Sequence, residues 1–422
     1  MANDFSKIAK QLQQYKTVQG IMKYVNKESL IEQHKKQEKN KTTGIDGISK
    51  TEYEENLEEN VSNLIKQMKT MSYKPKEVKR VYIPKTGSAE LRPLGIPAYE
   101  DRLVQGAMAE VLNEIYENIF LDCSYGFRPN RDCHQAIKKL DQIIMKKNIN
   151  YVVDADIKGF FNNVNHKWLV KFLELTIQDP KFIQYIVRFL KTGIMENMEH
   201  YESDKGTPQG GVISPILANV YLHYVLDLWF ELYIKIKCKG GAYLVRYADD
   251  FVCCFEKEED AKMFYRELKD RLNKFDLELA EDKSRIIPFG NKDSKEKFDF
   301  LGFTHTNSTN RKGKYKLSHH TSGKKSKAKK QAVKMWLKES VRIYKIPYLI
   351  KKLNIKLQGT FRYYGVSDNY KWMTSFREYA IYQLRYQLGR RSQRGKISWR
   401  KLNRILEYNP IIMPKIYHSM WQ

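Results

Sequence analysis

The sequence predicts an α+β domain of roughly 300 residues followed by an all-α domain. Short apolar strands alternate with amphipathic helices up to about residue 305. Beyond residue 325, apolar and aromatic side chains recur at helical spacing. The charge changes in the same place, because residues 311–422 hold 28 Lys and Arg against 4 Asp and Glu, whereas the preceding residues are nearly neutral.

The C-terminal basic block carries almost all of the net charge of +26, and Tyr, Phe and Trp are interleaved with its cations. This pattern is typical of a nucleic-acid-binding surface. An anionic membrane surface is the alternative, because Trp and Tyr also suit interfaces. We expect no membrane association and a cytoplasmic location, since the sequence has no membrane-length apolar run and no signal-peptide core. Five cysteines without a Cys-x-x-Cys pair fit a reducing compartment.

The elements can be justified in order from periodicity and turn residues. The first part is predicted to begin with a polar helical region (1–40), a turn (43–47) and a helix (51–71). A hairpin (78–97), a helix (101–120), a loop with two arginines (124–131) and a further helix (133–147) follow.

The next part begins with a short strand (151–157). One helix starting at residue 166 and a second helix (180–191) follow it. A Gly- and Pro-rich stretch (205–215) opens a long helix. A hairpin (242–255), a helix (258–275) and two strands (277–288 and 298–303) follow. We expect a linker or hairpin next (304–325). Three helices should follow, with apolar stripes in residues 333–344, 350–364 and 372–388.

The turn Tyr247-Ala248-Asp249-Asp250 places two carboxylates side by side between two apolar strands. Adjacent carboxylates are unfavourable unless a cation lies on them, and Mg²⁺ prefers oxygen ligands. A solvated acidic hairpin tip is the alternative for an isolated Asp-Asp pair. Asp156 ends another strand, and two-metal phosphoryl transfer uses carboxylates that come from separate strands.

Six motifs in one order resemble the group II intron-encoded reverse transcriptases over about residues 20–390. The motifs are Leu91 to Pro97, Ser124 to Asn130, Asp156 to Phe161, Gly206 to Pro215, Tyr247 to Asp250 and Phe300 to Phe303. The resemblance implies a right-hand polymerase fold, with fingers and a palm built on an antiparallel sheet, followed by an all-α thumb/maturase domain. The implied parts are an N-terminal extension with the start of the fingers (1–75), the fingers and palm (76–305), a linker (306–325), and the basic thumb/maturase domain with a short tail (326–422).

The resemblance also implies roles for individual residues. The implied catalytic metal ligands are Asp156, Asp249 and Asp250, and the implied cofactor is two Mg²⁺ ions, with Mn²⁺ as a substitute. The implied nucleotide contacts are Lys85, Arg92, Phe161, Gln209 and Lys283. The implied template and primer contacts are Arg128, Gly210, Leu301 and Gly302.

Chemistry supports some of these assignments and leaves alternatives open for others. An aromatic ring at position 161 would clash with a 2′-hydroxyl and favour deoxynucleotides, although core packing is the alternative. An Arg fork suits phosphate oxygens and a Lys serves as a point charge. Taken alone, however, Arg92 or Lys85 is more often a solvated surface charge, and for Lys283 a surface lysine is at least as good an interpretation. Gly210 permits close backbone approach, or simply starts a helix.

The implied activity is RNA-directed DNA polymerisation in the bacterial cytosol, in association with the nucleoid when the protein acts on DNA. The implied partners are an RNA template, a DNA or RNA primer, dNTPs, structured intron RNA and target DNA. Asn162 stands where many relatives carry Asp, residues 357–365 match the thumb signature loosely, and we expect a member of the type without the Cys-rich endonuclease module. Residues 398–422 are either a reduced DNA-contacting segment or the last helix of the bundle.

Three other functions remain open from the sequence. The first is an RNA-binding splicing cofactor, or maturase, with an inactive polymerase fold. Intact Asp156, Asp249 and Asp250 argue against it. The second is a polymerase that makes RNA, which Phe161 argues against. The third is a domesticated reverse transcriptase that serves repair or defence.

Overall fold

The structure is a computed structural model that describes residues 3–84, 91–196, 199–201, 205–206, 210–291, 293–391 and 395–420. The chain forms two compact units. The first contains residues 3–84, 91–136 and 151–286, and the second contains residues 137–150 and 287–420. The units divide between residues 136 and 137, within α6 (Cys133–Lys146), and between residues 286 and 287, within β8 (Arg285–Pro288).

The N-terminal helices of the first unit surround α5 (Tyr99–Tyr116), which is buried along most of its length. The expected helical region of residues 1–40 is divided into three helices, and the expected helix of residues 51–71 is divided at Asn56. These helices are α1 (Ser6–Tyr15), the 3₁₀ helix η1 (Ile21–Tyr24), α2 (Lys27–Lys36), α3 (Lys50–Glu55) and α4 (Leu57–Lys69).

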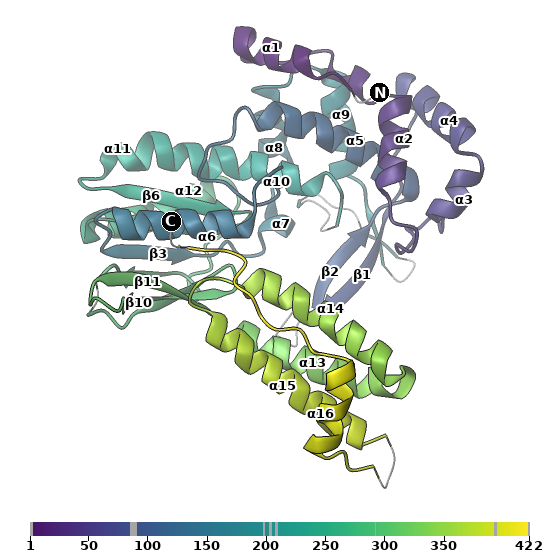
Figure 1. The fold of residues 1–422 in the computed structure, drawn as a ribbon. Helices are drawn as coiled ribbons and strands as arrows, with labels where there is room; N and C mark the ends of the chain where they lie inside the picture. The colour runs from purple at the N-terminus through teal and green to yellow at the C-terminus, as the bar shows by residue number, and fades with distance from the viewer. Residues whose placement is uncertain are drawn as a thin grey trace. The chain divides into compact units, whose positions relative to one another are not determined.

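Among the remaining helices of the first unit, α12 (Glu258–Lys274) packs on β3 (Tyr151–Ala155) and β7 (Asp250–Phe255). Figure 1 labels α12 beside β6 and β3. The helix expected after residue 215 is long but irregular, since two π-helical segments, η2 and η3, interrupt it. These elements are α7 (Phe160–Asn163), α8 (His166–Glu174), α9 (Pro180–Leu190), α10 (Ser214–Leu222), η2 (His223–Asp227), η3 (Phe230–Ile234), α11 (Lys235–Lys237) and α12 (Glu258–Lys274).

Two sheets complete the first unit, with strand orders β2-β1-β4-β5 and β6-β7-β3-β8. The second sheet matches the predicted strands: β3 and β6 both pair antiparallel with β7. All residues of β7 after Asp250 are buried, as expected for a strand covered on both faces. The bounds are β1 (Val78–Pro84), β2 (Leu91–Ile96), β3 (Tyr151–Ala155), β4 (Ile194–Glu196), β5 (Glu199–Tyr201), β6 (Ala242–Tyr247) and β7 (Asp250–Phe255).

Residues 277–288 were expected to form a strand, but only β8, at the end of this segment, does so. Leu279 makes a single bridge to Ile157, and the chain then turns at residues 281–283. The turn is held by the Ser284 hydroxyl, which donates to the Ala280 carbonyl oxygen at 2.8 Å. Charged Glu281, Asp282 and Lys283 are exposed by this turn, whereas a strand would point some of them inward.

The second unit combines a small sheet with a helical bundle. Residues 306–325 are not a linker, because most of them belong to a hairpin whose paired strands bury Leu317 and His319. The strands are β9 (Lys297–Phe300), β10 (Phe303–Thr309) and β11 (Tyr315–Thr321). The helices are α13 (Gly323–Ile343), α14 (Ile346–Tyr364), α15 (Tyr370–Gly389) and α16 (Trp399–Tyr408).

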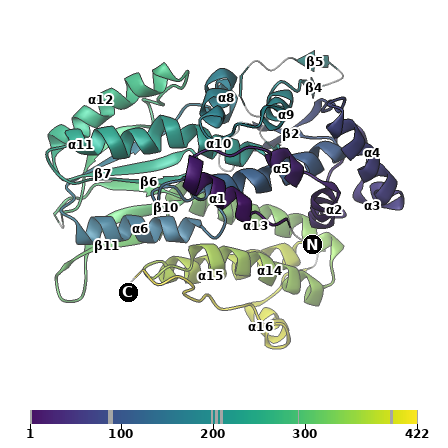
Figure 2. The same ribbon diagram turned by 90° about the horizontal axis from the view of Figure 1, so that it is seen from above.

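Helices α13, α14 and α15 lie side by side and share an apolar core, as the periodicity predicted (Figure 2). Leu402 of α16 is fully buried in the same core, so this part of the C-terminal tail belongs to the bundle. Within the described residues, no helix is both long and apolar enough to span a lipid bilayer.

Candidate functional site

The turn between β6 and β7 is a tight two-residue turn, since Tyr247 pairs directly with Asp250 across it. Ala248, the first residue of the turn, has a φ of 58°, in the left-handed region that hairpin turns of this kind require. A non-glycine residue holds this conformation only where the surroundings fix it. The turn therefore has to be fixed by contacts outside itself.

Arg246 supplies one of these contacts from within the sheet. Its guanidinium has no exposed surface and forms an ion pair with Asp227 at 2.7 and 2.6 Å. The same group donates to the Ala248 carbonyl oxygen and to Asn219 Oδ1, both at 2.9 Å, and to Ser124 Oγ at 2.8 Å. Arg246 thus connects the acidic turn to helix α10, segment η2 and the loop at residue 124. We call this set of contacts the Arg246 brace.

The loop of residues 124–130 packs directly against the same turn. A Cβ atom on Gly126 would lie 2.4 Å from the Ala248 nitrogen, so glycine is required there by close backbone approach. Asn219 Nδ2 donates to the Gly126 carbonyl oxygen at 2.7 Å, and Tyr125 N donates to the Arg246 carbonyl oxygen at 2.8 Å. The turn is therefore held from two sides.

Asp156 reaches this turn from the neighbouring strand. Ala155, the last residue of β3, pairs with Phe251 of β7, so continuing the register brings Asp156 beside Asp250. Burial raises the pKa of Asp249, and the negative charge of Asp156 raises this pKa further. The three acids predicted from the sequence thus come from adjacent strands at one end of the sheet, and two of them interact electrostatically.

The turn at residues 280–284 holds Asp156 from the other side. The Asp156 backbone N–H donates to Ser284 Oγ at 3.2 Å, and its carbonyl oxygen accepts from Ala280 N at 2.8 Å. Lys283 Nζ lies 3.7 Å from Asp156 Oδ2. Both side chains are largely solvent-exposed, so this ion pair adds little stability, but it places a cation beside the carboxylates.

A metal ion would fit the two interacting carboxylates. Burial and the charge of Asp156 oppose ionisation of Asp249, and a divalent cation between the two side chains would remove that repulsion. No group of three or more His, Cys, Asp or Glu side chains within the described ranges has the arrangement of a complete metal site.

Three more of the residues singled out in the sequence lie in the first unit. Arg92 is an exposed residue of β2 whose positive charge lowers the pKa of Asp249, so it acts on the acidic turn. Phe161 is partly buried and packs edge to face on Phe160, with ring centroids 5.3 Å apart. Gly210 has a φ of 115°, and a Cβ there would lie 2.3 Å from the Gly95 carbonyl oxygen of β2.

Arg128 occupies a different environment from the one expected. Its side chain is 2% exposed and forms a bidentate pair with Glu117, with both N–O distances at 2.9 Å. It also donates to the carbonyl oxygens of Leu121 and Ser124. A guanidinium whose donors are occupied inside the protein holds the loop in place, and we therefore interpret Arg128 as a residue that positions this loop.

Lys85 and Gln209 lie outside the described residues. Leu301 and Gly302 belong to the second unit, where they form the two-residue turn between β9 and β10 with φ angles of 49° and 79°. The Leu301 carbonyl oxygen accepts a hydrogen bond from Tyr363 Oη at 2.9 Å.

Sequence reasoning assigned no role to the residues of the Arg246 brace. The sequence signal for them is an arginine inside the apolar strand that leads to the acidic turn, together with Asp227 inside an otherwise apolar helix. Buried charges of this kind need partners, so each should have prompted a search for the other. Ser124 and Asn219 give no comparable signal.

Comparisons with known proteins agree with these observations. A family described as reverse transcriptase (RNA-dependent DNA polymerase) matches residues 83–305. The group II intron-encoded protein LtrA of Lactococcus lactis subsp. cremoris is 37% identical over 236 residues, which are 54% of this chain and 36% of that protein. Protein YkfC of Escherichia coli (strain K12) is 35% identical over 201 residues, 47% of this chain and 52% of that protein.

A more distant relative is the putative COX1/OXI3 intron 1 protein of Saccharomyces cerevisiae, which is 27% identical over 274 residues, 54% of this chain and 32% of that protein. The matches to LtrA, YkfC and this protein span about half the length of each relative or less.

Proposed function

Because the chain belongs to the reverse transcriptase (RNA-dependent DNA polymerase) family, we propose that it adds deoxynucleotides to a primer 3′-hydroxyl on an RNA template. The observation that carries the proposal is the register of β3 and β7, which brings Asp156 beside Asp250 at the end of the sheet where the β6–β7 turn carries Asp249. In this reaction the primer 3′-oxygen bonds to the α-phosphorus, the 3′-hydroxyl proton departs and pyrophosphate leaves.

Asp156, Asp249 and Asp250 would hold two divalent cations, Mg²⁺ or in its place Mn²⁺. Reverse transcriptases generally use divalent metal ions, which when bound favour ionisation of the 3′-hydroxyl and offset the charge of the transferring phosphate. The protein supplies a preformed position for this charge, because the Arg246 brace and Gly126 fix the turn before substrate binds.

Other residues would bind and orient the nucleotide. Arg92, exposed on β2 and electrostatically coupled to Asp249, is suited to the triphosphate. Phe161, partly buried against Phe160, is suited to exclude a 2′-hydroxyl. Lys283, which lies beside Asp156, is suited to the leaving pyrophosphate. Lys85 and Gln209 remain predicted nucleotide contacts, as Gly210, Leu301 and Gly302 remain predicted template or primer contacts.

Primer extension tests the proposal. The full chain with Mg²⁺, an RNA template, a DNA primer and dNTPs should extend the primer, and Asp249→Ala should abolish extension while RNA binding remains. Asp282→Ala, which removes an exposed carboxylate from the nearby turn, is the matched control and should extend normally. An Asp249→Ala variant that extends at the normal rate would show that the site assignment is wrong.

A second assay tests sugar selection at the same site. Phe161→Val should incorporate ribonucleotides more readily than the unmodified protein, because the smaller side chain leaves room for a 2′-hydroxyl. Unchanged discrimination between dNTPs and NTPs would assign Phe161 to core packing instead. Efficient RNA synthesis by the unmodified protein would favour the alternative of a polymerase that makes RNA.

We also propose that the chain binds structured intron RNA and assists its splicing and mobility, which would add intron RNA and target DNA to its partners. The group II intron-encoded relatives and the basic block of residues 311–422 favour this second function. Lys and Arg contacts to phosphates predict salt-sensitive binding. Splicing of a group II intron RNA should therefore accelerate with added protein, and acceleration by a chain that never extends primers would leave the splicing-cofactor alternative standing.

A further inference from the structure

The surface between α13 and α15 forms a groove in the described part of the helical bundle. It encloses a cavity of about 500 Å³, lined on one side by Lys334 and Lys338 of α13 and on the other by Tyr382 and Tyr386 of α15 and by Arg390, which follows the last residue of α15. The residues that line it include no Asp or Glu. We call this cavity the tyrosine–lysine groove.

The two tyrosines form a platform of exposed aromatic rings. Tyr382 is 46% exposed and Tyr386 is 44% exposed. Their ring planes are within 12° of parallel, with centroids 6.5 Å apart, and Arg390 lies over the Tyr386 ring at 5.6 Å. Exposed parallel rings followed by a guanidinium plane offer successive stacking surfaces to nucleobases.

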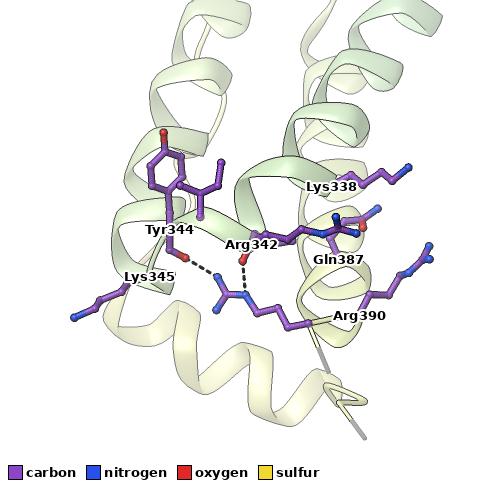
Figure 3. A pocket seen from close by; sticks show the side chains of 9 residues that line it. Lys338, Arg342, Tyr344, Lys345, Gln387 and Arg390 are labelled. Atoms are coloured by element: carbon purple, nitrogen blue, oxygen red, sulfur yellow. Dashed lines mark hydrogen bonds between the residues drawn. The ribbon is translucent and has the colours of Figure 1, made fainter. Parts of the chain in front are cut away.

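Cations continue beyond the platform at the end of the bundle. A second cavity, of about 660 Å³, shares Lys338 and Arg390 with the groove and adds Arg342 and Lys345, again with no acid in its lining. In Figure 3, Lys338 and Arg390 extend to the same side of the helices, whereas Lys345 extends to the other. Arg391 donates to the Val341 and Tyr344 carbonyl oxygens and so fixes the end of α15 against α13.

One residue that lines this groove has a buried acceptor atom without a hydrogen-bond partner. Gln383, which lies between Tyr382 and Tyr386 in the sequence, lines the groove and is 7% exposed. Its Oε1 atom has no hydrogen-bond partner among the residues that the structure describes. A buried acceptor without a partner is unfavourable by itself.

We propose that the tyrosine–lysine groove binds an unpaired nucleic-acid strand, with bases stacked on Tyr382 and Tyr386 and phosphates on Lys334 and Lys338. In a duplex both faces of each internal base are already covered, so a tyrosine platform is useful only to a single strand. The distance along α15 from Tyr382 to Arg390 is about 12 Å, which matches three to four stacked nucleotides. This inference goes beyond the polymerase function and does not depend on it.

The first test measures binding of fluorescein-labelled oligouridine to the full chain by fluorescence anisotropy. Excess unlabelled blunt duplex RNA is present, so that duplex-binding surfaces are occupied. Tyr382→Ala/Tyr386→Ala should weaken binding about tenfold or more. Tyr382→Phe/Tyr386→Phe keeps both stacking faces and should bind within about twofold of the unmodified protein. Tyr408→Ala, which removes an 87% exposed tyrosine of α16, controls for nonspecific loss of surface aromatics.

The second test separates phosphate contacts from stacking. Lys334→Gln/Lys338→Gln should reduce the slope of log affinity against log salt by about 1.4, because each single-strand phosphate contact contributes about 0.7. Lys351→Gln, which removes an exposed lysine of α14, should leave this slope nearly unchanged. The double alanine variant should lose affinity at an unchanged slope.

Several outcomes would overturn the proposal. The first is normal oligouridine binding by the double alanine variant. The second is a loss of duplex binding in this variant as large as its loss of oligouridine binding. The third is an equally large loss of polyglutamate binding in this variant, which would indicate a site for acidic chains. A parallel series with oligothymidine shows whether the groove accepts RNA, DNA or both. Circular dichroism confirms that each variant is folded. Asp249→Ala should bind oligouridine normally, so a failed polymerase assignment would not affect this result.

Discussion

The Arg246 guanidinium and the Asp227 carboxylate form an ion pair in which neither side chain has any exposed surface, with N–O distances of 2.7 and 2.6 Å. Asp227 ends the π-helical segment η2, and Arg246 lies three residues before Asp249. Helical irregularities of this kind occur frequently at functional sites. Here the irregular segment supplies the acid that orients the residue supporting the acidic turn.

Removing one partner should therefore destabilise the protein strongly. Arg246→Met leaves Asp227 buried without a counter-charge, and breaking a buried pair in this way costs about 3–5 kcal/mol. Urea unfolding followed by circular dichroism measures this loss. Lys262→Met, which breaks an exposed ion pair with Glu258 on α12, is the control and should change the free energy of unfolding by less than about 1 kcal/mol.

The double variant Arg246→Met/Asp227→Leu separates stability from turn geometry. Replacing a buried ion pair by apolar side chains is often neutral or stabilising, so the free energy of unfolding should recover relative to Arg246→Met. The hydrogen bond to the Ala248 carbonyl oxygen remains absent, and primer extension should stay low. Recovery of extension together with stability would show that the brace contributes packing alone.

Gly126 offers a second test of the same turn. Gly126→Ala would place a methyl group 2.4 Å from the Ala248 nitrogen, and the turn would have to move. Misplacement of a catalytic group by about 1 Å can lower the rate about 100-fold. Primer extension at saturating dNTP should fall by this order while the protein stays folded.

The matched control for Gly126→Ala is Gly359→Ala in α14, where nothing lies within 4 Å of the added Cβ atom. Alanine is preferred over glycine in a helix by about 0.5–1 kcal/mol, so this variant should be slightly more stable and fully active. A Gly126→Ala variant as active as Gly359→Ala would mean that the turn tolerates displacement.

The sequence was sufficient to predict the elements that bring Asp156 and Asp249 together, because apolar alternation predicts strands and adjacent strands bring their ends close. It could not predict the supports of the turn. Arg246 acts through partners 19 to 122 residues away, and no local pattern encodes such pairs. The turn before β8 was missed for a similar reason, since Ser284 and Asp156 become neighbours only in the folded chain.

Arg92 should contribute to the pH dependence of the reaction. Its charge lowers the pKa of Asp249, against the raising effects of burial and Asp156. Removing the charge in Arg92→Gln should therefore raise this pKa. Since the reaction needs the ionised carboxylate, the acidic limb of the pH–rate profile should move to higher pH. Extension rates at saturating dNTP across pH 5.5–8.5 measure the shift.

Lys79→Gln removes an exposed cation from the same β1–β2 hairpin and is the control for Arg92→Gln. Its pH–rate profile should coincide with that of the unmodified protein. A uniform loss of rate in Arg92→Gln, with no movement of the acidic limb, would show that Arg92 binds the nucleotide without affecting Asp249.

Asp141, a buried residue of α6 in the second unit, should make stability depend on pH. Burial and the charge of Asp368 raise the pKa of Asp141 to about 7, although Lys316 opposes this shift. An unfolded Asp titrates near 3.9, so the native protein ionises this group unfavourably, and stability is lost as the pH rises from about 4 through 7. His319 Nε2 lies 3.6 Å from Asp141 Oδ1, and burial lowers the pKa of both His319 and His305.

Asp141→Asn removes only the carboxylate contribution, because both histidines remain in the variant. Its stability relative to the unmodified protein should increase with pH between 5 and 8, towards a limit on the order of 4 kcal/mol. Urea unfolding at several pH values measures the difference. Asp293→Asn, in an exposed turn of the same unit, should show no such trend. A constant difference for Asp141→Asn would mean that His319 or Lys316 already neutralises the carboxylate in the folded protein.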